Sequence, residues 1–250
     1  MLQVKDLCVE IGGKLVVNGA SFAVMPRDKV GLVGRNGAGK SSLLTALVGL
    51  QKPDSGTSHI CGKASADLKG KVRRETVGFI PQEPSDLLYG QSVLGECQQG
   101  DKDNQIATGT TFALLQRIVP SISPNTHPRD LSEGQRLALA LAIVLSAQPQ
   151  VLILDEPTRG LDYQSKALLI GLLQNYSKEL GCCVLIATHD VELVAELADR
   201  VIFLADGEIV ADGPTLDILL SSPAFAPQVA KVMSPRRWLT VSDVISAMEE

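Results

Sequence analysis

The stretch Gly34-Arg35-Asn36-Gly37-Ala38-Gly39-Lys40-Ser41 decides the fold, because an apolar run (residues 30–33) precedes it and a helical pattern (residues 42–50) follows it. This order predicts a strand, a glycine-rich turn and a helix. Glycines allow successive backbone N–H groups to curl around an anion, and the helix behind them adds its positive end. Lys40 would then reach the β- and γ-phosphates of a nucleotide, and Ser41 would hold Mg²⁺. A chance match is the alternative, but the flanking strand and helix argue against it.

The composition is that of a soluble, globular chain. With 250 residues, 45% hydrophobic and 20% charged, it can bury a full core as one domain or as a core with a subdomain. The net charge of −5 indicates no large basic face, which weakens a nucleic-acid role without excluding it. The five cysteines lack metal-ligand spacing, so we expect reduced thiols. No apolar run approaches the ~20 residues that span a bilayer, and no signal-peptide pattern is seen, so another chain would supply any membrane-spanning part.

Short, continuous apolar runs predict strands that are covered on both faces. They occupy residues 30–33, 77–80, 151–154, 183–187 and 201–204. Helical patterns lie between most of them, so we predict a parallel α/β sheet with right-handed crossovers and a nucleotide at the carboxyl ends of its strands.

The N-terminal segment has a different pattern. Residues 2–8, 14–17 and 21–24 predict short strands broken by turns at Gly12-Gly13 and Asn18-Gly19, as at an antiparallel edge of hairpins.

Two further segments do not fit the sheet. Residues 83–147 contain no buried-strand run but predict helices at 91–98, 110–119 and 133–147, which indicates a helical insertion. After residue 213 we predict a short helix at 215–221 and a final helix at 241–250, which the capping-box sequence Thr240-Val241-Ser242-Asp243 would start.

Two carboxylates, Asp155 and Glu156, end the apolar run 151–154. Asp155 suits Mg²⁺ beside Ser41, directly or through water. Glu156 is then placed to polarise an attacking water as a general base. The alternative is that both acids merely end the strand before a turn at Pro157.

Ser132 begins another pattern, Ser132-Glu133-Gly134-Gln135-Arg136, just before the helix at 137–147. Ser132 is a natural N-cap, and Glu133 lies in the first turn, where the helix dipole favours an acid. Alone, this pattern indicates a well-started helix or a second anion site at a helix N-terminus.

These motifs together resemble those of ATP-binding cassette (ABC) ATPases, of which Ser-x-Gly-Gln is the signature. Gln82, after the run 77–80, resembles the family's Q-loop. Gly160-Leu161-Asp162 resembles its D-loop, and His189 its switch histidine. The series spans nearly the whole cassette in the expected order.

The resemblance implies a P-loop NTPase (RecA-like) α/β fold: a parallel-sheet core with an antiparallel β edge, a helical insertion subdomain and a C-terminal helical extension. In one ABC ATPase domain, 1–250, the nucleotide-binding core would comprise 1–82 and 148–213, the helical signature subdomain 83–147 and the extension 214–250.

The resemblance also assigns roles, with ATP and Mg²⁺ as cofactors. The nucleotide would bind Gly34 to Ser42 and pack against Ile11. Catalysis would use Lys40, Gln82, Glu156 and His189, and Mg²⁺ would meet Ser41, Gln82 and Asp155. Ser132, Gly134, Gln135 and Asp162 would act in trans, on the ATP of a second cassette that is identical or different.

Two positions depart from the family pattern. Glu133, third in the motif Leu131-Ser132-Glu133-Gly134-Gln135, adds a negative charge near a phosphate site, at small cost if its side chain points away. Ile11 replaces the aromatic residue that commonly stacks on adenine, which suggests weaker base selectivity.

Residues 83–89 and 222–229 resemble segments of energy-coupling factor (ECF), or cobalt-type, ATPases, as does the stretch 190–200. The tail and residues 127–130 resemble the second cassette of fused two-cassette forms. Leu87, Leu88 and Tyr89 would dock a membrane subunit through the 82–89 region, although three surface apolar residues are also normal on any protein.

The sequence thus predicts the ATP-hydrolysing subunit of an importer for a vitamin, a vitamin precursor or cobalt or nickel. The chain would lie in the cytoplasm on the inner face of the membrane, touching neither the solute nor nucleic acid. The alternative is a soluble ABC clamp acting on nucleic acid or the ribosome. A non-hydrolysing binding module conflicts with the set Asp155, Glu156 and His189.

Overall fold

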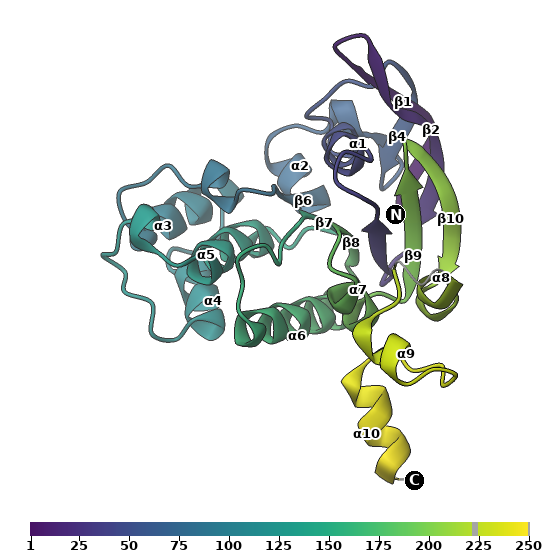
Figure 1. The fold of residues 1–250 in the computed structure, drawn as a ribbon. Helices are drawn as coiled ribbons and strands as arrows, with labels where there is room; N and C mark the ends of the chain where they lie inside the picture. The colour runs from purple at the N-terminus through teal and green to yellow at the C-terminus, as the bar shows by residue number, and fades with distance from the viewer. Residues whose placement is uncertain (222–224, 250) are drawn as a thin grey trace.

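A central six-stranded sheet organises the computed structural model, which describes residues 1–221 and 225–249. Its strand order is β10-β9-β3-β8-β7-β6 (Figure 1). The strands are β3 (Lys29–Val33), β6 (Val77–Ile80), β7 (Val151–Asp155), β8 (Cys183–Thr188), β9 (Arg200–Ala205) and β10 (Glu208–Pro214). All but β10 pair in parallel and coincide with the apolar runs, which confirms the predicted parallel core.

Both faces of this sheet are covered, and this explains the continuous apolar runs. Val151 and Ile153 pack toward α1 (Lys40–Leu47) and the N-terminal strands. The alternate residues, Leu152 and Leu154, pack on the other face. The helices of that second face are α5 (Glu133–Ser146), α6 (Tyr163–Leu180) and α7 (Val191–Leu197).

A second, antiparallel sheet has the order β2-β1-β4-β5. Its strands are β1 (Leu2–Ile11), β2 (Lys14–Val24), β4 (Ser55–Ile60) and β5 (Lys63–Ala64). The turn at Gly12-Gly13 is confirmed, because Ile11 pairs with Lys14. The turn at Asn18-Gly19 is wrong: β2 runs through it with a register shift against β1, and Asn18 N–H donates to Gly207 O (2.8 Å). A bulge, not a hairpin, uses this Asn-Gly pair.

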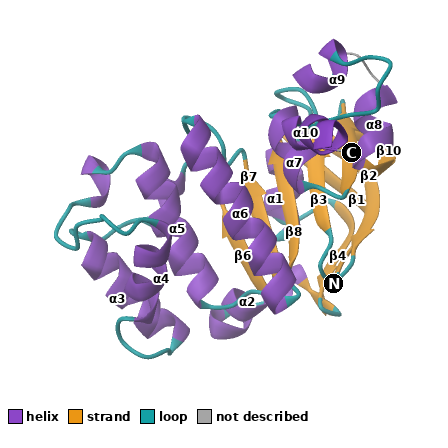
Figure 2. Cartoon of the chain, turned by 90° about the horizontal axis from the view of Figure 1, so that it is seen from below, coloured by secondary structure: helices purple, strands orange, loops and turns teal. Residues whose placement is uncertain are grey.

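The helical insertion has its own apolar core and lies beside the central sheet in both ribbon views (Figures 1 and 2). It contains α3 (Val93–Asn104), α4 (Thr110–Ile118) and α5. The three predicted helices are confirmed, although α3 continues beyond the predicted end at residue 98. Short 3₁₀ helices span Ser65–Asp67, Pro84–Leu87 and Pro128–Asp130, and α2 (Gly70–Thr76) precedes β6.

The C-terminal elements are α8 (Thr215–Ser221), α9 (Gln228–Val232) and α10 (Val241–Glu249). The predicted capping box is present: Thr240 N–H donates to Asp243 Oδ2 (2.8 Å), and Asp243 N–H donates to Thr240 Oγ1 (3.2 Å). Residues 222–224 and 250 of the predicted tail lie outside the described residues. None of the described helices combines the length and apolar character needed to cross a bilayer.

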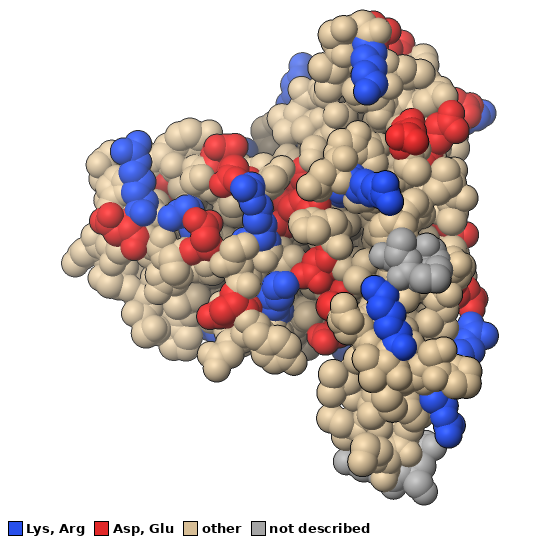
Figure 3. All heavy atoms as spheres, viewed as in Figure 1, with Lys and Arg blue, Asp and Glu red and all other residues tan. Residues whose placement is uncertain are grey.

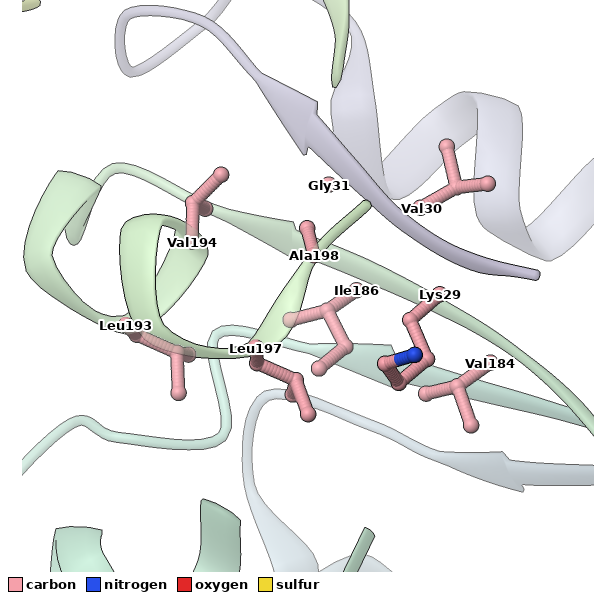
Figure 4. A pocket seen from close by; sticks show the side chains of 9 residues that line it. All are labelled: Lys29, Val30, Gly31, Val184, Ile186, Leu193, Val194, Leu197 and Ala198. Atoms are coloured by element: carbon pink, nitrogen blue, oxygen red, sulfur yellow. The ribbon is translucent and has the colours of Figure 1, made fainter. Parts of the chain in front are cut away.

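Helix α7 packs directly on Gly31 of β3, where a side chain would meet Val194. Figure 4 shows Val194 of α7 and Ala198, the residue that follows α7, beside Gly31, with Ile186 of β8 next to them. A Cβ on Gly31 would lie 2.8 Å from Val194 Cγ1. The helix that begins directly after His189 and Asp190 is therefore seated firmly on the strand that leads to the glycine-rich loop.

We predict that Gly31→Ala lowers the free energy of unfolding by about 1–3 kcal/mol, because the added methyl group overpacks the contact with Val194. Val194→Ala removes the opposing methyl groups, so Gly31→Ala should cost less in that background. Urea unfolding of the wild type, both single variants and the double variant measures the difference. An equal cost in both backgrounds would contradict this packing account.

Candidate active site

Four adjacent parallel strands deliver predicted site residues to one edge of the sheet. In the register of β3 with β8, Val33 lies opposite Thr188, and in that of β7 with β8, Asp155 lies opposite Ala187. Strand β6 continues the set beside β7. The loops that carry Gly34, Glu156, His189 and Gln82 therefore leave the sheet side by side, at the edge where open α/β sheets bind ligands.

At two of its glycines, Gly34 and Gly39, the glycine-rich loop passes too close to neighbouring backbone to admit a side chain. A Cβ on Gly39, whose φ is 101°, would lie 2.3 Å from Val16 O, and one on Gly34 would lie 2.3 Å from Leu204 O. These contacts hold the loop against β2 and β9. Arg35, Asn36 and Gly37 form its exposed tip, Ala38 is buried, and Ser41 and Ser42 lie in the first turn of α1.

Lys40 turns its ammonium group inward and is only 6% exposed. Its Nζ donates to Gly34 O (2.9 Å) and Arg35 O (3.3 Å) and lies 3.4 Å from Glu156 Oε1. A buried ammonium needs such partners to offset the loss of water. The lysine of the glycine-rich loop and the carboxylate after β7 thus belong to one electrostatic cluster.

Glu156 is the centre of that cluster. Its φ of 49° lies in the left-handed region, which non-glycine residues rarely adopt, and its N–H donates to Ala187 O (2.8 Å). Its Oε2 accepts from Thr188 Oγ1 (3.1 Å) and His189 N–H (3.3 Å) and lies 2.7 Å from His189 Nδ1. Because a carboxylate accepts, the proton of this last bond sits on Nδ1. The remaining imidazole nitrogen is left for a ligand.

Asp155 carries a buried oxygen that the protein does not satisfy. It is 3% exposed, and its Oδ1 has no hydrogen-bond partner among the described residues. Burial raises the pKa of this carboxyl group, whereas the Ser41 hydroxyl lowers it. An unpartnered buried carboxylate oxygen beside a hydroxyl suits a hard cation such as Mg²⁺. Ser41 and Asp155 would hold the ion, which would neutralise phosphate charge when bound.

Gln82 faces the same region. It lines a cavity of about 250 Å³ together with Glu156, Arg159 and Gly160. The structure therefore brings Lys40, Gln82, Asp155, Glu156 and His189 together.

Of the signature residues, Glu133 lines the same cavity as Gln82 and Glu156, whereas Ser132, Gly134 and Gln135 line a separate pocket. Ser132 is the N-cap of α5: its Oγ accepts from Gln135 N–H (3.3 Å), and Gln135 Oε1 accepts from Ser132 N–H (3.1 Å). With Gly134 they line an apolar pocket of about 260 Å³ otherwise formed by residues from α4 to α6. The capping box uses the Gln135 N–H, so those of Glu133 and Gly134 remain at the helix start to meet an anion.

Asp162 and Ile11 also lie outside the cluster. Asp162 is the exposed N-cap of α6 and accepts from Ser165 N–H (2.8 Å). The hydrogen bonds of Ser165 lower the pKa of Asp162. Ile11 ends β1 with half of its surface exposed. Glu133, the departure in the signature, pairs with Arg136 Nη1 (3.0 Å), so its charge is partly neutralised within its own helix.

Sequence reasoning missed Thr188, Thr158, Lys166 and Asp190. Thr188 bonds Glu156 directly, and Asp190 accepts from both Thr158 Oγ1 (3.2 Å) and Lys166 Nζ (2.6 Å). The position of Thr188 and Asp190 on either side of His189, directly after a buried strand, is the signal that could have found two of them.

The sequence and the structure of this chain are similar to those of known ABC transporter ATP-binding proteins. The model of the ABC transporter family matches residues 17–159. A Streptomyces coelicolor protein named as an ABC transporter ATP-binding protein is 50% identical over 246 residues, 98% of this chain and 44% of the relative. The energy-coupling factor transporter ATP-binding protein EcfA of Methanothermobacter thermautotrophicus is 33% identical over 227 residues, 87% of this chain and 72% of the relative.

Among solved structures, CbiO1 of Clostridium perfringens, part of the ABC transporter complex CbiONQ, is 28% identical with a TM-score of 0.76. That match covers 100% of this chain and 98% of CbiO1. By contrast, this chain spans less than half the length of the Streptomyces relatives that it matches.

We predict that Asp155→Asn abolishes the Mg²⁺-dependent part of the stabilisation by ATP. A ligand at 100 times its Kd raises the free energy of unfolding by about 2.7 kcal/mol. In the wild type, thermal unfolding with ATP should occur at a higher temperature with Mg²⁺ than with EDTA. In Asp155→Asn the two temperatures should coincide, because the amide lacks the charge that holds the ion.

The control is Asp67→Asn, at an exposed carboxylate in the 3₁₀ helix Ser65–Asp67, which should keep the wild-type difference. A full Mg²⁺-dependent shift in Asp155→Asn would refute the assignment of the ion to this carboxylate.

Proposed function

This chain belongs to the ABC transporter family of ATP-binding proteins, and from this membership we propose that it is the ATP-hydrolysing subunit of an ECF-type importer. ATP and Mg²⁺ are the cofactors of the family. The observation that carries the proposal is the Glu156 carboxylate, which contacts His189 and Thr188 and lies 3.4 Å from the Lys40 ammonium, at the mouth of the glycine-rich loop.

Each residue of the cluster has a chemical task in this proposal. The glycine-rich loop and Lys40 bind the phosphates, and Ser41, Gln82 and Asp155 surround Mg²⁺. Glu156 takes the proton of the attacking water, and His189 contacts the γ-phosphate through the nitrogen that does not face Glu156. General-base catalysis of this kind contributes ~10²- to 10⁴-fold.

A second cassette, identical or different, completes the site. Ser132, Gly134 and Gln135 lie at the N-terminus of α5 and line a pocket separate from the glycine-rich loop of their own chain, and the capping box leaves the backbone N–H groups of Glu133 and Gly134 unused. We infer that this helix start binds the γ-phosphate of ATP on the partner cassette, with Asp162 acting across the same interface. The Streptomyces relatives are long enough to hold two such cassettes, which supports a likeness to the fused two-cassette forms.

The membrane partner would dock at a groove of about 710 Å³ beside the 82–89 region. Leu88, Tyr89, His127, Pro128 and Arg129 are among its lining residues. Tyr89 is 83% exposed, as expected of an aromatic interface residue in the absence of its binding partner. ATP binding would close two cassettes and move the membrane subunit through this groove, and hydrolysis with product release would reopen them.

The imported solute would be a vitamin, a vitamin precursor or cobalt or nickel. It would pass through the membrane subunit without touching this chain, which would lie on the cytoplasmic face. The likeness to EcfA and CbiO1 supports an ECF-type transporter, and the substrate class is the one that the resemblance to ECF ATPases implies. The alternative of a nucleic-acid clamp is not favoured: the net charge is −5, and basic and acidic side chains are interspersed on the face seen in Figure 3.

We predict that Glu156→Gln leaves ATP binding intact and lowers hydrolysis by more than ~10²-fold, because the amide cannot accept the proton of water. The variant should also accumulate as a closed dimer with ATP, visible by size-exclusion chromatography. Lys40→Ala is the contrasting variant: it should lose tight ATP binding. Full turnover by Glu156→Gln would refute the general-base assignment.

We predict that Tyr89→Asp lowers recovery of the membrane subunit by at least ~10-fold, because docking would bury an unpaired charge. The chain is purified from detergent-solubilised membranes, and the accompanying proteins are identified and quantified. Leu180→Asp, at an exposed apolar residue at the end of α6, is the matched control and should retain the partner. Recovery of the chain without any membrane protein would favour the clamp instead.

A further inference from the structure

Asp190 joins three segments that surround the candidate active site. Its Oδ1 accepts from Leu193 N–H (3.1 Å) and caps α7. Its Oδ2 accepts from Thr158 Oγ1 (3.2 Å), in the loop after Glu156, and from Lys166 Nζ (2.6 Å), on α6. A helix cap requires only the first of these bonds. The second oxygen therefore makes a connection that capping alone does not explain.

Two of the three residues in this connection, Asp190 and Thr158, are largely shielded from water. The side chains of Asp190 and Lys166 are 16% and 36% exposed, and Thr158 is buried. Burial by itself raises the pKa of the Asp190 carboxyl group, but the hydrogen bonds from Lys166, Leu193 N–H and Thr158 outweigh it and hold that pKa below its ordinary value. The carboxylate is thus held charged between fixed donors, unlike an exposed surface ion pair.

A chain of hydrogen bonds leads from Asp190 to Glu156. Asp190 N–H donates to Thr188 Oγ1 (3.0 Å), and Thr188 Oγ1 donates to Glu156 Oε2 (3.1 Å). The same Glu156 oxygen faces His189 Nδ1, and His189 directly precedes Asp190. A shift of Asp190 would therefore tilt the Thr188–Asp190 segment and change how His189 and Thr188 meet Glu156.

The other end of the connection lies at the start of α6. Lys166 N–H donates to Asp162 O (3.0 Å), so the lysine stands one helical turn after the exposed N-cap. In the dimer of the proposed function, Asp162 meets the second cassette. Lys166 thus links that surface to the loop that carries His189.

We propose that Lys166 and Asp190, together with Thr158, form a positioning brace that ties the start of α6 to the His189–Glu156 pair and aligns that pair for hydrolysis. The proposal rests on the proposed ATPase function. None of the three residues touches the reacting atoms, so they are positioning residues. The brace should therefore act on the rate of hydrolysis and not on the affinity for ATP, which the glycine-rich loop sets.

The test compares Lys166→Met, Asp190→Asn, their double variant and Lys166→Arg in the full-length protein, assembled with its partner cassette. Asparagine keeps an oxygen that can cap α7 but loses the charge that holds Lys166, so Asp190→Asn separates bracing from folding. Lys178→Met, at an exposed lysine in the last turn of the same helix, is the matched control. The readouts are kcat for ATP hydrolysis and the Kd for ATP.

We expect kcat to fall about 10-fold in Lys166→Met and in Asp190→Asn, with the Kd for ATP changed less than about twofold. The kcat of the double variant should be no lower than that of the single variant with the lower kcat, because both changes break the same interaction. Lys166→Arg should restore most of kcat, and Lys178→Met should match the wild type.

The outcomes distinguish a failure of the proposed brace from a failure of the proposed ATPase function. If the wild type binds ATP but does not hydrolyse it, the proposed function fails and the brace fails with it. If the wild type hydrolyses ATP and the variants match it, only the brace is refuted. Independent, multiplicative losses in the double variant, or a Kd that weakens in step with kcat, would likewise refute positioning, because they indicate separate or purely structural roles.

Discussion

The parallel register of β3, β8 and β7 is the constraint on which the site depends. Val33 lies opposite Thr188 and Asp155 opposite Ala187, so three loops begin at one level of the sheet. Because both faces of these strands are buried, a shift of one residue would turn every apolar side chain toward the wrong layer. Hydrophobic packing deep in the sheet therefore fixes where the loops that lead to Lys40, Glu156 and His189 begin.

The charged side chains at the strand ends reduce the stability that this packing provides. Lys40, Asp155 and Glu156 are each less than a tenth exposed, and Asp155 Oδ1 is unpartnered among the described residues. Burying such groups costs free energy unless they are paired. The ammonium near Glu156 offsets part of that cost, while Asp155 and Glu156 repel one another. An arrangement that weakens the fold in this way is expected where side chains are kept ready for a ligand.

Local patterns in the sequence predicted the elements that local physics controls. The five parallel strands, the helices of the insertion, the N-cap at Ser132 and the capping box at Thr240 follow from apolar periodicity and cap chemistry. Strand β10 was missed although Asp206-Gly207, with φ of 48° and 83°, is a hairpin turn that the sequence displays. Strand β4 was missed because its sequence, Ser-Gly-Thr-Ser-His-Ile, is mostly polar and becomes a strand only by pairing with β1. The Asn18-Gly19 bulge likewise depends on Gly207, far along the chain.

Contacts between segments that are distant in the sequence also fix the position of α5, which begins with the signature residues, against α6. A Cβ on Gly134 would lie 3.1 Å from Ser165 Oγ, and one on Gly160 would lie 3.2 Å from Glu133 Cγ. The start of α5 thus packs closely against the first turn of α6 and the loop before it, and Lys166 on α6 reaches Asp190. In the proposed dimer, an anion that binds at the start of α5 would lie close to α6, the helix whose Lys166 contacts Asp190 in the loop of His189. The glycines at these two contacts, Gly134 and Gly160, therefore allow the starts of α5 and α6 to pack together. In the proposed dimer, this pair of helices would lie between the nucleotide of the partner cassette and the nucleotide of its own chain.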